Sequence, residues 1–308
     1  MMRRVRGALR GFAIGTAAAL AATPAFAGTG QPSPWQIGLQ GSVTEISDFI
    51  HVFHNSVNIV IIAIAVFVLI LLAIVVFRFN ENANPTPSKT THHTGLEVAW
   101  TIIPVFILVA IAIPSFKLLF AQYSYPKADL TLKATGNQWN WTYGYPDYGN
   151  FNFTSIMLTD AERSERSKKG IPSPRLLSVD NEAVVPVNAV VHVLVTSTDV
   201  IHNWTVPSFG SKVDAVPGRT TATWFKVRQE GIFYGQCSEL CGKDHAFMPI
   251  AVRVVKPEVF QQWAELMKAR KRGPARELIE KAAIEQAGGH KVADSAASAA
   301  PAITVAGK

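Results

Sequence analysis

An unbroken apolar stretch from Ile59 to Phe77 constrains the fold of this 308-residue chain more than any other feature. It has no polar face, and a segment of about 20 apolar residues is long enough to cross a bilayer. A second apolar segment runs from about Val98 to Phe120 and contains Pro104, Pro114 and, near its end, Lys117. Proline is tolerated inside membrane helices, and a terminal lysine can extend to the interface. The sequence therefore predicts two transmembrane helices.

The N-terminal residues have the layout of a cleavable secretory signal. Arginines up to Arg10 precede the uncharged stretch 11–22, and Ala25-Phe-Ala27 offers a cleavage site, so residues 1–27 are expected to be removed. Export followed by two crossings places residues 28–55 and everything after Phe120 outside the cytoplasm. Residues 56–120 then comprise two membrane helices, at about 59–77 and 98–120, and a cytoplasmic loop.

The formal charge of +7 comes from the two ends of the chain. Four of the 29 basic residues lie in the signal, and residues 256–308 hold nine basic and six acidic residues, which leaves sixteen of each sign in 28–255. No nucleic-acid surface is implied by this distribution.

From Lys127 to about Val255 the pattern changes to short β-rich runs separated by Pro, Gly, Asn and Asp, such as Leu130–Thr135 and Ile250–Val255. About 130 residues of this kind predict one antiparallel sandwich with its own core. The polar stretch Glu162–Pro174 is expected to be a surface excursion.

Residues 256–308 differ in composition from the β-rich part. Pro257–Arg272 and Arg276–Gln286 are predicted to be two helices, and the Ala-, Gly- and Ser-rich residues from Ala287 onward are predicted to be disordered.

Both cysteines of the protein lie in one twelve-residue loop that also contains a histidine and a methionine. Thiolate, imidazole and thioether ligands together select copper. Cys237 and Cys241 are close enough for both sulfurs to face one centre, and a mononuclear site needs only one thiolate, so the loop suggests two bridged metal ions, with His245 and Met248 as further ligands.

Two such ions need a further terminal ligand, for which His202 is the candidate because it follows an apolar strand-like run. A backbone carbonyl near Glu239 completes the expected set. The alternative is a disulfide between the two cysteines, which cysteine pairs in exported proteins commonly form.

Several motifs resemble the bacterial-type subunit II of haem-copper cytochrome c oxidases. They are the helix pair, the aromatic segment beginning at Gly136, the segment Asp214–Arg219, and Tyr234–Gly242 with His245 and Met248. The resemblance covers about residues 36–255. It implies a membrane-anchored α+β protein in the bacterial inner membrane, in which a two-helix hairpin is followed by a cupredoxin-like Greek-key sandwich or barrel (127–255) in the periplasm.

The same resemblance implies an electron-accepting subunit of a respiratory, proton-pumping oxidase that is not active alone. A binuclear copper centre held by His202, Cys237, Glu239 (through its carbonyl), Cys241, His245 and Met248 would take electrons from cytochrome c and pass them to haem in subunit I, where oxygen is reduced to water. Trp139 would be the point at which electrons enter. The Glu239 carboxylate would bind magnesium or manganese shared with subunit I. Glu97 would lie at the mouth of a proton channel.

The implied partners are subunit I, subunit III, the lipid bilayer and a cytochrome c that is either soluble or membrane-tethered. Gly144 and Asn150 stand at positions that are often acidic in the family, so we expect weaker electrostatic steering of the donor. A membrane-anchored copper chaperone or thiol oxidoreductase is the alternative function. A copper-free quinol oxidase subunit would lack the metal ligands, and a mononuclear blue-copper carrier would lack the second cysteine.

Overall fold

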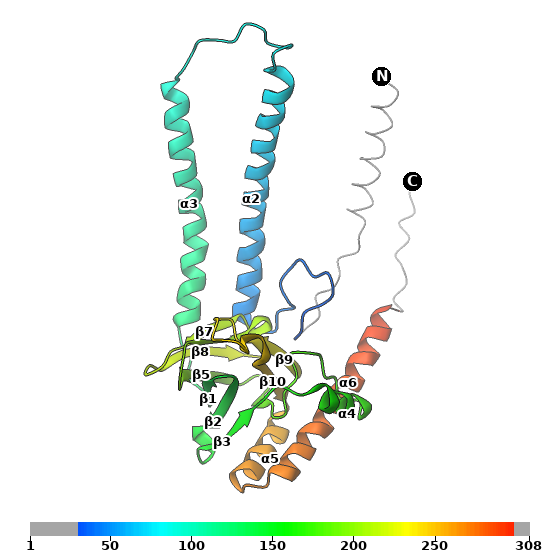
Figure 1. Ribbon diagram of the computed structural model, residues 1–308. Coiled ribbons are helices and arrows are strands. Elements are labelled where there is room, and N and C mark those ends of the chain that lie inside the picture. Colours follow the sequence, from blue (N-terminus) through cyan, green and yellow to red (C-terminus); the bar gives the residue numbers. More distant parts are fainter. Residues whose placement is uncertain (1–29, 299–308) are drawn as a thin grey trace, which may run out of the picture.

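The computed structural model describes residues 30–298, so the expected signal segment 1–27 lies outside the described part of the chain. Two long helices, α2 (Glu45–Arg78) and α3 (Thr94–Tyr123), stand side by side on a β-domain and are joined at their far ends by a loop (Figure 1). At 1.5 Å per residue they are about 50 and 45 Å long, which exceeds the roughly 30 Å of bilayer hydrocarbon. Helix α3 has no buried residue, although it contacts α2 and β8. Both helices are long and apolar enough to span a membrane.

Helix α2 begins well before the apolar run, and its first turn rests on the β-domain. Thr44 caps it by accepting from the Ser47 amide (3.1 Å) and also donates to the carbonyl of Phe209 (2.7 Å). Arg228 donates two hydrogen bonds to the carboxylate of Asp48, at 2.5 and 3.1 Å. Residues 45–55 of the expected periplasmic segment therefore form the first turns of α2.

The end of α3 is attached to the same domain. Trp224 donates its indole N–H to the carbonyl of Gln122 (3.1 Å), and the Tyr125 hydroxyl donates to the carbonyl of Ala222 (2.8 Å). Both long helices are therefore held by residues of the β-domain at the ends that lie next to it.

Within residues 30–298, ten strands form three sheets, with the orders β3-β2-β1-β5-β8, β4-β10-β9 and β6-β7. The strands are β1 (Leu130–Asn137), β2 (Asn140–Tyr145), β3 (Phe151–Ser155), β4 (Ala183–Pro186), β5 (Val190–Ser197), β6 (His202–Val206), β7 (Ser211–Ala215), β8 (Thr221–Lys226), β9 (Gly231–Gln236) and β10 (Pro249–Val255). The expected sandwich is confirmed, but its strands do not all run antiparallel, because β1 pairs with β5, and β10 with β4, in parallel. Parallel neighbours need long crossovers, which the alternation of side chains along one strand does not reveal.

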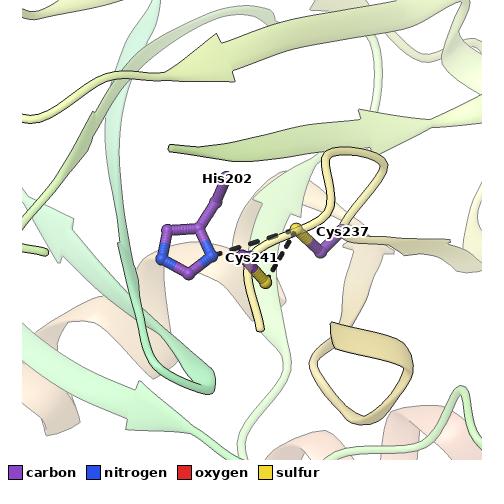
Figure 2. A group of neighbouring side chains, drawn as sticks. All are labelled: His202, Cys237 and Cys241. Atoms are coloured by element: carbon purple, nitrogen blue, oxygen red, sulfur yellow. Dashed lines mark hydrogen bonds between the residues drawn. The ribbon is translucent and has the colours of Figure 1, made fainter. Parts of the chain in front are cut away.

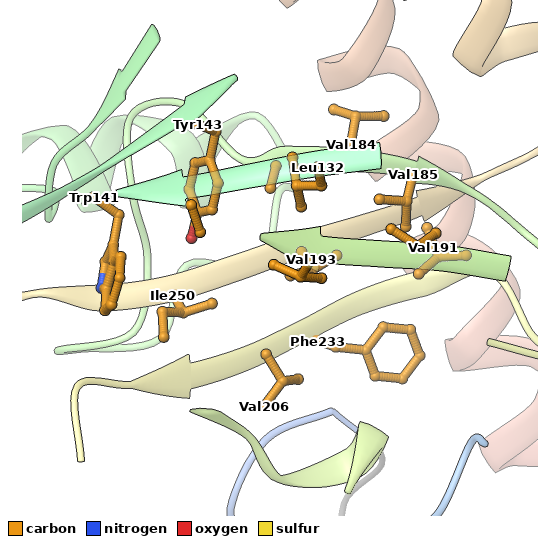
Figure 3. Close-up of a cluster of buried hydrophobic side chains, with 14 of the residues drawn as sticks. Leu132, Trp141, Tyr143, Val184, Val185, Val191, Val193, Val206, Phe233 and Ile250 are labelled. Carbon is orange, nitrogen blue, oxygen red and sulfur yellow. The ribbon is translucent and has the colours of Figure 1, made fainter. Parts of the chain in front are cut away.

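Side chains from the five-stranded sheet face those of the β4-β10-β9 sheet across a continuous core (Figure 3). Leu132, Tyr143 and Val193 from one sheet and Phe233 and Ile250 from the other are all at most 1% exposed. The start of β6, the end of β9 and the start of β10 meet beside this core, and the metal-ligand candidates lie there.

The C-terminal extension packs against the β-domain. Helix α5 (Pro257–Lys268) buries Phe260 and Trp263, and the Trp263 ring meets Tyr145 edge-on with centroids 5.1 Å apart. Helix α6 (Arg272–Ser298) adds Ala275 and Ile279 to the core. It starts before the expected second helix and continues past Ala287, where disorder is predicted.

The predicted surface excursion contains a short helix, α4 (Asp160–Lys168). Thr159 and Glu162 form a capping box at its start, which satisfies two backbone amides that would otherwise be unpaired.

Candidate metal centre

The cysteine loop connects two neighbouring strands of one sheet. It leaves β9 after Gln236, passes through the 3-10 turn η3 (His245–Phe247) and enters β10 at Pro249. The Cys237 amide donates to the carbonyl of Met248 (3.4 Å), and the Ser238 amide donates to the carbonyl of Asn203 on β6 (3.3 Å). These bonds hold the loop closed and against β6.

His202 is the first residue of β6 and has no exposed surface. Its Nδ1 lies 3.9 Å from the sulfur of Cys237, which lies 3.8 Å from the sulfur of Cys241 (Figure 2). The ligand atoms of these three residues all lie within 4.8 Å of one another. Both cysteines are free, and their sulfurs are much farther apart than the roughly 2 Å of a disulfide.

His245 and Met248 complete the cluster from within the loop. The Cys241 sulfur lies 3.5 Å from Nδ1 of His245 and 3.5 Å from the Met248 sulfur, and Met248 is 1% exposed. The Glu239 carbonyl lies 3.3 Å from the Cys237 sulfur. The structure thus brings together every residue that the sequence predicts as a copper ligand.

Two further residues orient His202. The Nε2 atom of His202 lies 2.8 Å from the carboxylate of Asp199, so its Nδ1 faces the sulfurs. Partners of this kind fix the orientation of a metal-binding imidazole. A Cβ on Gly136 would approach the His202 ring to 2.8 Å, so glycine leaves the space that this buried ring occupies.

The two thiols differ strongly in acidity. Burial by itself raises the pKa of Cys237, but hydrogen bonds from His202 and from the backbone at Glu239 and Asn203 outweigh it and lower the pKa to about 7. Burial, together with the adjacent Cys237 thiolate, raises the pKa of Cys241 to about 12. Burial opposes protonation of His202, but its contacts with Cys237 and Asp199 prevail and raise its pKa. The surroundings therefore favour a thiolate at Cys237 and a thiol at Cys241, and a bound cation would favour the loss of the proton from both.

Trp139 is half-buried beside the cluster. Its indole N–H donates to the Cys241 carbonyl (3.2 Å), and the Gln138 side-chain amide donates to the same oxygen (2.9 Å). Gly242, at φ 125°, lies against the ring, since a Cβ there would be 2.8 Å from Cζ2. The backbone N–H of Gln138 donates to the Asp199 carboxylate (2.7 Å). This carboxylate therefore links the residue before Trp139 to His202.

Sequence reasoning overlooked Gln138, Asp199 and Gly242 as supporting residues. Asp199 carries a local signal, because it lies three residues before His202 in a turn. Gln138 carries none, since its contact with Cys241 spans more than one hundred residues.

The side chains of the two remaining predicted residues, Glu239 and Glu97, are not part of the cluster. The Glu239 side chain is exposed, and within the described residues no second carboxylate joins it in a metal-binding group. Glu97 lies in the first turn of α3, where it accepts from the His93 amide (3.2 Å). This turn is at the end of the helix far from the β-domain (Figure 1).

The donor set fits copper on the chemistry of its atoms. Two cysteine sulfurs, two imidazole Nδ1 atoms, a thioether and a carbonyl oxygen converge at one largely buried place. Hard cations such as Mg²⁺ prefer oxygen ligands, whereas thiolate and thioether ligands favour copper.

Comparisons with known proteins cover both parts of the chain. Residues 130–255 match the family model "Cytochrome C oxidase subunit II, periplasmic domain", and residues 32–118 match "Cytochrome C oxidase subunit II, transmembrane domain". A probable cytochrome c oxidase subunit 2 of Rickettsia bellii is 45% identical over 233 residues, covering 76% of this chain and 84% of the relative. Cytochrome c oxidase subunit 2 of Cereibacter sphaeroides is 43% identical over 275 residues, covering 83% and 90% of the two chains.

A solved structure, the periplasmic domain of subunit II of the cytochrome oxidase of Bradyrhizobium japonicum, is 57% identical. It covers 48% of this chain and 99% of its own, with a TM-score of 0.43.

Proposed function

The chain belongs to the cytochrome c oxidase subunit II family, and from this we propose how its residues receive and pass on electrons. As a member it is the subunit through which electrons enter a haem-copper oxidase, an oxidoreductase complex, and it is anchored by two helices with its β-domain in the periplasm. The observation that carries the proposal is the convergence of His202, Cys237, Cys241, His245 and Met248 at one buried place.

These residues would hold two copper ions. His202 and His245 would be terminal ligands, Cys237 and Cys241 would bridge, and Met248 and the Glu239 carbonyl would bind weakly. The bound pair would supply a one-electron carrier whose charge is shared between two metals. The protein contributes a closed loop and an imidazole oriented by a carboxylate, so the ligands need to move little when the charge at the site changes.

Trp139 would be where the donor's electron enters. Its indole N–H is bonded to the carbonyl of Cys241, a proposed bridging ligand, which offers a short route from the half-buried ring to the centre. The donor would be a cytochrome c that is membrane-tethered or less basic than usual, because the surface lacks acids at Gly144 and Asn150. Second-order rates that stay steeply salt-dependent with a soluble basic cytochrome would contradict this choice of donor.

Two carboxylates would serve the assembled oxidase. The exposed side chain of Glu239 would bind magnesium or manganese together with oxygen ligands of subunit I, because one carboxylate cannot hold such an ion alone. Glu97, at the cytoplasmic end of α3, would lie at the mouth of a proton channel. The haems would belong to subunit I, and subunit III would be a further partner.

The domain boundaries and location follow the same reasoning. Residues 1–27 would be a signal peptide, 28–55 a periplasmic segment, 56–120 the membrane hairpin of a bacterial inner membrane protein, 127–255 the copper domain and 256–308 an extension. A membrane-anchored copper chaperone or thiol oxidoreductase is not favoured by the family membership.

The test is the copper content and electron paramagnetic resonance spectrum of the full chain, purified in detergent and loaded with copper. Two coppers sharing one unpaired electron are expected. Cys237→Ser should abolish this signal, and Ser238→Ala, a change at the exposed neighbouring position, should retain it. One copper per chain, or a Cys237–Cys241 disulfide without copper, would refute the binuclear site.

A further inference from the structure

An exposed cation lies over the ring of the tryptophan at which electrons are proposed to enter. The Nζ atom of Lys243 is 5.7 Å from the centroid of the Trp139 ring, within the range of a cation–π contact. The Lys243 side chain is 78% exposed. Its backbone position is set by Gly242, which packs directly against the same ring. Any protein that reaches this ring from solvent therefore meets the ammonium group.

The nearby acidic groups do not reverse this charge. Asp199 is committed to His202 and to the Gln138 amide, and its side chain is only 30% exposed. The Asp244 carboxylate lies 4.0 Å from the Lys243 ammonium and carries the opposite charge. Of these three charged side chains, Lys243 is the one whose charged group lies over the Trp139 ring.

We propose that Lys243 determines which donors this oxidase accepts. It disfavours a cytochrome whose exposed haem edge is surrounded by lysines and admits one whose edge is neutral or acidic. The inference rests on the proposed role of Trp139 and adds the charge of the partner surface. Lys243 touches the docked protein and not the metal centre, so its charge acts on the encounter and the docked complex.

The size of the effect follows from Coulomb's law. Two unit charges about 7 Å apart in water interact about half as strongly as at 4 Å, so removing one repulsive pair changes an association constant roughly threefold, and reversing the charge changes it roughly tenfold. The change should appear in kcat/KM and KM, with kcat nearly constant, and should shrink as added salt screens the charges.

The experiment compares the assembled wild-type oxidase with its K243Q and K243E variants. The donors are a soluble basic cytochrome c and the same cytochrome with its lysines succinylated, which reverses its surface charge. With the basic donor, kcat/KM should rise roughly threefold in K243Q and roughly tenfold in K243E at low ionic strength. With the succinylated donor, the order should be reversed.

K281E is the matched control. Lys281 is exposed on α6. This helix contacts β9 near the start of the strand, whereas the cysteine loop leaves the other end of β9. This variant should leave both rates within twofold of wild type. Equal kcat/KM values for K243E and wild type with both donors would overturn the proposal.

A W139F oxidase assayed in the same series separates this failure from failure of the proposed function. If W139F is slow while K243E is unchanged, electrons enter at Trp139 but Lys243 does not select the donor. If W139F retains full turnover with both donors, the assignment of Trp139 is itself wrong, and the donor selection that depends on it is overturned as well.

Discussion

Replacing Glu182 by glutamine should strongly destabilise the β-domain. The Glu182 carboxylate accepts from Arg166 Nη2 at 2.9 Å and from Arg253 Nε and Nη2 at 2.7 and 3.0 Å. The three side chains are at most 10% exposed. Arg253 also donates to Gln286 of α6 (2.9 Å), so the network ties the C-terminal extension to β4, β10 and α4.

The expected cost is about 3–5 kcal/mol, the usual price of leaving a buried charge without its partner. Glutamine keeps one acceptor oxygen but turns an amide N–H₂ donor toward guanidinium donors, so about two charge-assisted bonds of roughly 1.5–3 kcal/mol each are lost. A domain of this size should then melt roughly 6–20 °C lower.

The pH dependence has a defined sign. Burial raises the pKa of Glu182, but the charges of Arg253 and Arg166 prevail and hold it below the ordinary value. A depressed carboxyl pKa contributes stability that is present above the pKa in the unfolded chain, about 4.3, and is lost as the pH falls through the lower folded value. The difference between wild type and E182Q should therefore be constant from about pH 8 to 5 and shrink below about pH 4.

The assay is guanidinium unfolding of the purified chain in detergent, followed by tryptophan fluorescence, at several pH values. E277Q is the control, because Glu277 is exposed on α6 and should change the free energy of unfolding by less than about 0.5 kcal/mol. A cost for E182Q below about 1 kcal/mol, or one that persists unchanged at pH 3, would refute the reasoning.

Three shorter predictions concern the metal centre. Gly242→Ala should displace the Trp139 ring and slow oxidation of cytochrome c about tenfold or more, with the copper spectrum retained; unchanged turnover would contradict the close contact. In the copper-free chain, alkylation should modify Cys237 first, with a rate that rises through about pH 7, whereas Cys241, with its pKa near 12, reacts slowly; equal rates measured by mass spectrometry would disprove the asymmetry. Asp199→Asn should weaken copper binding about 10–100-fold in a competition titration with a chelator, because the orientation of its histidine partner is loosened.

The architecture was predictable wherever a local pattern carries the information. The run from Ile59 to Phe77 has no polar face, and this alone requires a bilayer or complete burial. The loop from Cys237 to Met248 places four soft donors so close in sequence that any compact path brings them together. His202 was a candidate only because of its place at the end of a strand-like run, and β6 does bring it to the sulfurs.

Other features depend on contacts between distant segments. The parallel pairing of β1 with β5 cannot be deduced from either strand, since both alternate in the same way whichever direction the neighbour runs. Helix α6 begins earlier than expected, at Arg272, and Ala275, which lies before the predicted helix, packs into the core. Tertiary packing outweighs weak local preference here.

The sequence by itself determined that the protein has two membrane helices, a β-rich domain and a copper-type set of ligands, because hydrophobic length and ligand chemistry are properties of short segments. Only the tertiary structure decided that Asp199 orients His202, that Trp139 is bonded to the carbonyl of Cys241, and that Lys243 stands over the tryptophan ring. Two of these three contacts join residues that lie more than a hundred positions apart in the chain. Their geometry exists only once the sheets have paired.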